Sequence, residues 1–180
     1  METYFLDTCV LYAYVNEADR FHQKAWSMFE RILKKGDRLI ISQYVLFEFV
    51  LLSIKNAAED YFEENPDVPV LPETEFNSIL NKIEIQRDLL TTLEGFEVHE
   101  TVIPNNSSSM IEKLISSLEI TNKTIKNGTM LYTTKFMGLL DFIHLICCQI
   151  NNCDYFLTYD RDFNNRKLKG VFKTFKIIIM

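Results

Sequence analysis

The feature that most constrains the fold is a series of short apolar runs separated by longer segments with helical periodicity. Such short runs are typical of strands buried on both faces of a sheet. The strands predicted in this way lie at residues 3–6, 39–41, 97–103, 155–157 and 171–179. Between the first two, apolar side chains recur at helical spacing from Arg20 to Lys35, and Gly36 is placed to end that helix. Strands alternating with helices predict an α/β domain with a mainly parallel sheet of about five strands.

The length and one change in composition define the domain organisation. With 180 residues the chain is long enough for a single well-packed domain, 1–180, and too short for two ordinary ones. Residues 59–75 contain seven acidic side chains and three prolines, which argues against a central strand or a continuous helix. We therefore predict a helical insertion at about 59–128. Helices are predicted at 8–16, 44–54 (apolar and largely buried), 76–90, 110–118 and within 130–150.

The overall composition predicts a cytoplasmic protein without a membrane partner. Apolar residues make up 47% of the chain and charged residues 24%, as in soluble globular proteins. No run approaches the ~20 apolar residues that span a bilayer, and the N-terminus does not resemble a secretory signal. The cysteines lack the spacing of a metal site and are predicted to be buried free thiols: Cys9, Cys147, Cys148 and Cys153.

The net charge of −6 hides an uneven distribution of charge along the chain. Residues 1–100 carry 19 acidic and 9 basic side chains, whereas residues 101–180 carry 6 and 10. The C-terminal basic side chains include Arg161, Arg166 and Lys167. They are compatible with a phosphate-bearing substrate held at one edge of the protein, and equally with an ordinary solvated surface.

Several acidic residues lie where the local pattern calls for an apolar one. They are Asp7 after the first strand, Glu48 and Asp141 inside apolar helices, and Asp160 and Asp162 after the fourth strand. Ligands of parallel α/β sheets bind beyond the carboxyl ends of the strands, where Asp7 and Asp160 are expected. Buried carboxylates without basic partners repel one another unless a cation is present. The set therefore predicts a site for Mg²⁺ or Mn²⁺.

Each of these acids also has a simpler structural interpretation. Asp7 is suited to cap the helix that follows it. The others can be explained by an ion pair of Glu48 with Arg38, by the favourable charge of Asp141 near a helix N-terminus, and by turn positions for Asp160 and Asp162. The metal-site interpretation therefore depends on the set and not on any single member.

The acidic residues and their surroundings together resemble a known family. The segments FLDTCVLY, QYVLFEFVL, LLDFIHLICCQINNCDYFLT and LTYDRDF are similar, in order, to the landmarks of PIN-domain ribonucleases, including VapC toxins. The resemblance implies a three-layer α/β/α fold, an acidic cleft that binds Mg²⁺ or Mn²⁺, and hydrolysis of single-stranded RNA. It also implies an antitoxin protein and a homodimer as partners.

The resemblance assigns roles to individual residues. Asp7, Glu48, Asp141 and Asp160 correspond to the four catalytic and metal-binding acids, with Asp162 as the alternative fourth acid. The hydroxyls of Thr8 and Thr158 are expected near the cleft as supporting groups. Independently of the resemblance, the basic charge of the last segment predicts that Arg161, Arg166 and Lys167 bind the RNA backbone.

The sequence also departs from the family pattern. Asp141 follows Glu48 by 93 positions, a longer spacing than in compact toxins, and His144 stands where many relatives have a small residue. A phosphotransferase with a D-x-D motif is disfavoured because Cys9 replaces its second acid. The remaining alternative is a catalytically silent PIN-like module that binds protein or RNA. The retention of all four acidic positions argues against this alternative.

Overall fold

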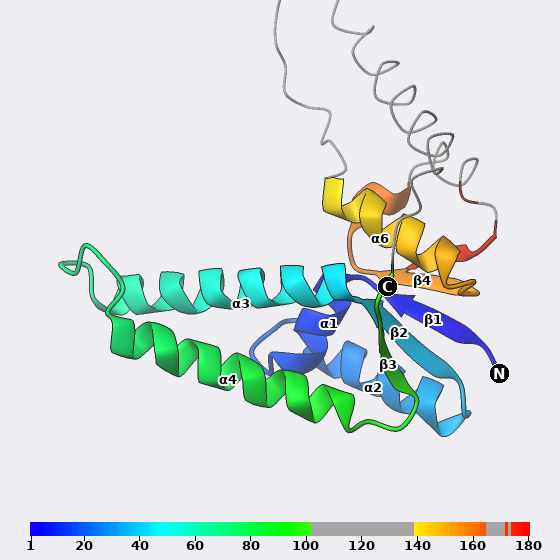
Figure 1. Cartoon of the computed structure of the whole chain (residues 1–180), viewed down its shortest axis with the longest axis horizontal. Helices are drawn as coiled ribbons and strands as arrows, with labels where there is room; N and C mark the ends of the chain where they lie inside the picture. Colours follow the sequence, from blue (N-terminus) through cyan, green and yellow to red (C-terminus); the bar gives the residue numbers. More distant parts are fainter. Residues whose placement is uncertain (102–138, 165–171, 173) are drawn as a thin grey trace, which may run out of the picture.

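The computed structural model describes residues 1–101, 139–164, 172 and 174–180, which form a parallel sheet flanked by helices (Figure 1). The strands are β1 (Thr3–Leu6), β2 (Arg38–Ser42), β3 (Phe96–His99), β4 (Tyr155–Thr158) and β5 (Lys176–Ile179). The helices are α1 (Thr8–Val15), α2 (His22–Lys34), α3 (Gln43–Glu64), α4 (Glu73–Thr91) and α6 (Leu139–Ile150), with a 3₁₀ helix at Arg161–Asn164.

The five strands are all parallel and follow the order β3-β2-β1-β4-β5. In Figure 1, α6 crosses one face of this sheet, and α1 and α2 lie on the other side. The predicted three-layer α/β/α fold is thereby confirmed. Because the chain leaves β1 toward β2 on one side and later returns to β4 on the other, the strand order reverses between β1 and β4. Ligands bind at such switch points in open α/β sheets.

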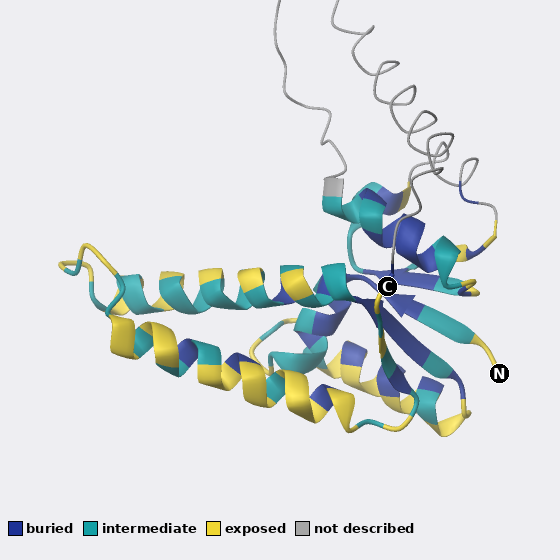
Figure 2. Cartoon of the chain, in the orientation of Figure 1, coloured by how far each residue is buried: buried dark blue, intermediate teal, exposed yellow. Residues whose placement is uncertain are grey.

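The central strands are largely buried (Figure 2), and their apolar side chains contribute to the core. Phe5 of β1 pairs in register with Ile40 and Phe156, and its ring lies 5.9 Å from that of Phe156. All three side chains are almost completely buried. The sheet is therefore a rigid support for the loops at the carboxyl ends of its strands.

The predicted end of the second helix is confirmed in detail. Gly36 adopts a left-handed φ of +73°, which glycine tolerates best. Its N–H donates to the carbonyl of Leu33, and the N–H of Asp37 donates to that of Ile32. These are the two bonds of a Schellman motif, which ends α2 just before β2 begins.

The α3–α4 hairpin corrects two sequence predictions. Helix α3 continues through Glu59 to Glu64, because acidic side chains are tolerated on an exposed helix surface; the break comes only before Pro66. The apolar part of α3 is also less buried than predicted. Phe47 and Leu51 are 59% and 49% exposed, so no neighbouring element covers these two apolar side chains among the described residues. In Figure 1 the hairpin extends well beyond the sheet.

The other predicted elements agree in position and differ in length. Strand β3 is shorter than the predicted 97–103, and β5 begins at Lys176 within the predicted 171–179. The helix predicted at 110–118 lies outside the described residues, as do 130–138 of the predicted 130–150 helix. The single-domain prediction with an insertion at 59–128 stays a prediction. Of the helices that the structure describes, none is long and apolar enough to cross a membrane.

Candidate metal centre

Asp7 follows β1 directly and occupies the N-cap position of α1. Its side chain is almost fully buried and is surrounded by donors. Oδ1 accepts from the Thr8 N–H at 2.9 Å, and Oδ2 accepts from the Thr158 hydroxyl at 2.6 Å and from the Cys9 thiol at 3.1 Å. Asp7 therefore caps α1 and also presents its carboxylate at the switch point, so the two interpretations of this residue are compatible.

Glu48 lies on α3, which begins at the carboxyl end of β2. The Ser42 hydroxyl caps this helix by accepting from the Val45 N–H. The Thr8 hydroxyl donates to Oε2 of Glu48 and holds the carboxylate beside Asp7. The suggested ion pair of Glu48 with Arg38 is not formed.

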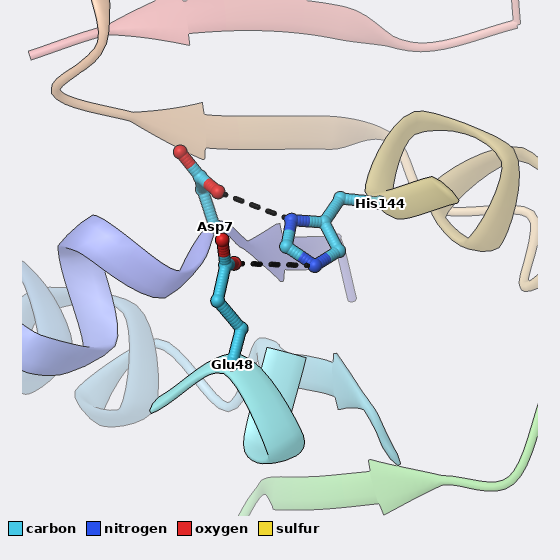
Figure 3. A group of neighbouring side chains, drawn as sticks. All are labelled: Asp7, Glu48 and His144. Carbon is cyan, nitrogen blue, oxygen red and sulfur yellow. Dashed lines mark hydrogen bonds and ion pairs between the residues drawn. The ribbon is translucent and has the colours of Figure 1, made fainter. Parts of the chain in front are cut away.

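His144 completes a compact group with these two acids (Figure 3). Its imidazole comes from α6 and is fully buried. Nδ1 lies 3.3 Å from Oδ1 of Asp7, and Nε2 lies 3.6 Å from Oε2 of Glu48. One ligand atom from each residue can be chosen such that all lie within 4.8 Å of one another. Two carboxylates and an imidazole suit a divalent metal ion.

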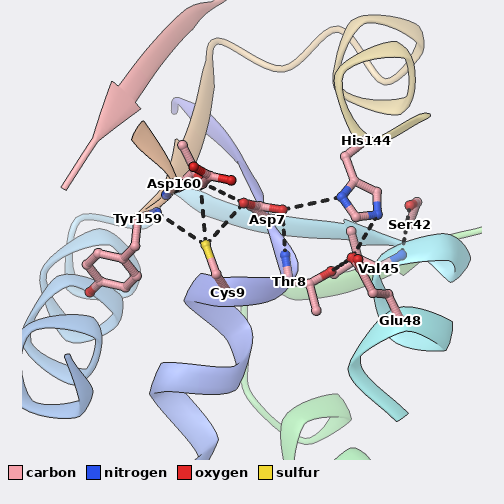
Figure 4. A network of polar contacts seen from close by, with 10 residues as sticks. Asp7, Thr8, Cys9, Ser42, Val45, Glu48, His144, Tyr159 and Asp160 are labelled. Carbon is pink, nitrogen blue, oxygen red and sulfur yellow. Dashed lines mark hydrogen bonds and ion pairs between the residues drawn. The ribbon is translucent and has the colours of Figure 1, made fainter. Parts of the chain in front are cut away.

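Asp160 borders this group through the residues that surround Asp7 (Figure 4). Its N–H donates to Oγ1 of Thr158 at 2.9 Å, so one hydroxyl links Asp7 to the segment after β4. Oδ1 of Asp160 accepts from the N–H of Asp162 at 2.8 Å, which is the local bond of an Asx turn. The turn interpretation therefore describes Asp160, whose half-buried carboxylate still lies near the switch point.

The remaining predicted residues are not all brought into this group. Asp141 is half-buried in the first turn of α6, three residues before His144 and thus on a similar side of the helix. Asp141, Asp160 and Asp162 are not members of the compact group. Arg161 is exposed in the 3₁₀ helix. Two predicted substrate-binding residues, Arg166 and Lys167, lie outside the described residues.

Burial controls the protonation of two side chains beside the site. Burial, and then the charge of Asp7, raise the pKa of the Cys9 thiol well above its usual range. Cys9 therefore stays protonated at neutral pH and serves as a hydrogen-bond donor to Asp7. Burial also raises the pKa of Tyr159 to about 12, so its hydroxyl is neutral as well. Neither group adds negative charge beside the carboxylates.

Sequence reasoning missed His144 as a member of the site, although the signal was present. Like the predicted acids, His144 is a polar side chain within an apolar segment, LLDFIHLI. The sequence spacing of His22, His99 and His144 does not predict a histidine cluster. A single histidine that joins acids from other elements does not require a histidine cluster.

Comparison with known proteins identifies the family to which this fold and site belong. The family model of the PIN domain matches residues 4–168, so the chain belongs to the PIN-domain family. Family membership supports a nuclease activity. A search of curated proteins finds no match.

Two solved structures are similar to this chain at low sequence identity. One is VapBC2 from Rickettsia felis, bound to a DNA fragment from its promoter, with 15% identity and a TM-score of 0.50. The match covers 98% of each chain. The other is VapC20 of Mycobacterium tuberculosis, a toxin that cleaves the sarcin-ricin loop, with 12% identity and a TM-score of 0.49. It covers 89% of this chain and 92% of that one.

Proposed function

We propose that this protein is a divalent-metal-dependent endoribonuclease that hydrolyses phosphodiester bonds of single-stranded RNA. The observation that carries the proposal is the convergence of Asp7 and Glu48 from separate elements at the switch point of the sheet. The donor set fits Mg²⁺ or Mn²⁺, and the buried Nε2 atom of His144, which has no hydrogen-bond partner among the described residues, faces the same place.

The proposed roles follow from position and hydrogen bonding. Asp7 and Glu48 hold the ion, and Asp141 and Asp160, or Asp162 in place of the latter, supply further acidic ligands directly or through water. A bound divalent ion would polarise the phosphoryl oxygen and lower the pKa of a bound water. Glu48, oriented by the Thr8 hydroxyl, aligns or deprotonates the attacking water.

A cleavage assay on a defined single-stranded RNA tests the proposal. The wild type is compared with Asp7→Asn in Mg²⁺, Mn²⁺ and EDTA. Asp154→Asn is the matched control, because Asp154 immediately precedes β4 and accepts a bond from the Thr3 N–H at the opposite end of the sheet. We expect EDTA and Asp7→Asn each to reduce cleavage about 100-fold or more, and the control to cleave normally. Equal activity of wild type and Asp7→Asn would favour the silent binding module.

We further propose that the nuclease is the toxin of a toxin–antitoxin pair, as the motif resemblance implies. Expression of the wild type in a bacterial host should then arrest growth, and Asp7→Asn should not. The toxin role also predicts an adjacent gene for a small protein whose coexpression restores growth and yields a copurifying complex. Unimpaired growth with soluble, RNA-cleaving wild-type protein would contradict the toxin role. Light scattering of the purified chain tests the implied homodimer.

A further inference from the structure

His144 is an unusual residue for the place that it occupies. It lies on the apolar helix α6 with no exposed surface, and Nε2 has no hydrogen-bond partner among the described residues. A buried polar atom without a partner costs about 1–3 kcal/mol. Such a cost requires an explanation, and here Nε2 faces Glu48 while Nδ1 of the same ring faces Asp7, the two acids of the candidate metal centre (Figure 3).

The contact with Asp7 indicates which ring nitrogen is available. An ionised carboxylate only accepts hydrogen bonds, so Nδ1 must donate to Oδ1 of Asp7 across the 3.3 Å that separates them. In the neutral ring this leaves the lone pair on Nε2. Metal-binding histidines show the same arrangement, in which a carboxylate holds the N–H of one nitrogen and the other nitrogen binds the ion.

The contact with Glu48 indicates what Nε2 faces. The 3.6 Å between Nε2 and Oε2 of Glu48 is longer than a hydrogen bond and brings two lone-pair atoms together. Two ligand atoms about 2.1 Å from one ion lie about 3.0 Å apart when adjacent and about 4.2 Å when opposite. The observed separation falls within this range, so Nε2 and Glu48 can share one ion.

We infer that Nε2 of His144 is a nitrogen ligand of an ion that Glu48 also binds, with Asp7 orienting the ring through Nδ1, and that it makes this site prefer Mn²⁺ over Mg²⁺. The inference deepens the proposed function, since it takes the acidic group as the metal centre of that nuclease. Mg²⁺ prefers a shell made entirely of oxygen, whereas imidazole suits transition-metal ions. His144 thereby acts as a determinant of metal choice at a centre otherwise composed of carboxylates.

Direct metal binding tests the inference without reference to cleavage. Pulsed electron paramagnetic resonance of Mn²⁺ bound to the wild type should show hyperfine coupling to a directly bound ¹⁴N, which His144→Gln should abolish. Calorimetry should show that His144→Gln weakens Mn²⁺ binding about 10-fold or more and changes Mg²⁺ binding less than about threefold. His22→Gln is the matched control, because His22 contacts the Ala13 carbonyl and is not in the acidic group.

The outcomes separate the inference from the proposed function. Mn²⁺ bound without ¹⁴N coupling in the wild type, a measurement that needs no variant, would overturn the role of His144 and leave a metal nuclease intact. Tighter metal binding by His144→Gln would also overturn the inference. It would mean that the ring of the wild type competes with the metal ion as a cation and does not bind it. Nitrogen-bound Mn²⁺ without RNA cleavage would sustain the inference and contradict the nuclease.

Discussion

At the scale of single residues, Asp7 shows how a buried charge is kept at the centre of this domain. Burying an unpaired carboxylate costs several kcal/mol, but Asp7 accepts from a backbone N–H, a hydroxyl and a thiol. These donors hold the carboxylate in one orientation. Thr158 is the most informative of them, since it is fully buried and also accepts the N–H of Asp160.

Replacing Thr158 by valine should both destabilise the protein and weaken the site. Thr158→Val keeps the shape, removes a donor to Asp7 and leaves the Asp160 N–H without this acceptor. We expect a loss of about 1–3 kcal/mol in the free energy of unfolding, measured by urea denaturation, together with slower RNA cleavage. Thr158→Ser keeps the hydroxyl and should lose only about 1 kcal/mol for the buried methyl. Equal effects of the two variants on cleavage would show that Asp7 does not depend on this hydroxyl.

At the scale of elements, an ion pair joins neighbouring strands at the β3 edge of the sheet. Arg38 of β2 donates from Nε to Glu97 of β3 at 2.7 Å, and a second guanidinium nitrogen contacts the other oxygen. The Arg38 hydrogen bonds, followed by that of His99, lower the pKa of Glu97 from 4.5 to about 2. The pair therefore contributes to stability only while Glu97 is ionised.

The pH dependence of stability follows from the direction of this shift. Because the pKa of Glu97 is lower in the folded protein than in the unfolded chain, its contribution is complete above about pH 4.5 and is lost as the pH falls toward 2. The difference in unfolding free energy between wild type and Glu97→Gln should be constant from pH 5 to 7 and shrink below. Urea denaturation across this range measures it, with exposed Glu100→Gln as the control. A difference that does not vary with pH would exclude this linkage.

The α3–α4 hairpin should be the least stable of the described elements. No residue from 50 to 78 is buried, whereas most of β1 and β2 is. Segments with few buried contacts open locally without unfolding the whole domain. Hydrogen exchange with mass spectrometry should show amides of residues 52–64 exchanging at least about 100-fold faster than those of β1. Equal protection would mean that the hairpin opens only with the entire sheet.

The elements also show what could be predicted from the sequence. Strands, helix α2 and its glycine end were predictable because their signals are local: short apolar runs, helical spacing and a residue suited to positive φ. Asp7 and Glu48 were predictable as exceptions within apolar segments. The exposure of Phe47 was not predictable, because a helix with apolar residues on all sides does not reveal which side contacts a neighbouring element. The approach of His144 to both acids depends on how α6 crosses the sheet, which no local pattern specifies.

At the scale of the whole molecule, the parallel sheet separates basic residues that are close in sequence. Because all five strands are parallel, the start of β5 lies at the opposite end of the sheet from the candidate metal centre. Lys176 begins β5, whereas Arg161 follows the carboxyl end of β4. Both side chains are exposed. Of these two residues, Arg161 is therefore the one placed to contact an RNA backbone that enters the proposed site.

The salt dependence of RNA binding tests whether RNA contacts the end of the sheet that carries Arg161. In an Asp7→Asn background, which prevents cleavage, Arg161→Gln should weaken binding of a single-stranded RNA. It should also make the slope of log affinity against log salt concentration less negative by about 0.7, the value for one lost phosphate contact on a single strand. Lys176→Gln removes the same charge at the far end and should leave the slope unchanged. Equal slopes for the two variants would mean that the RNA is attracted by overall charge and is not held at the end of the sheet that carries Asp7.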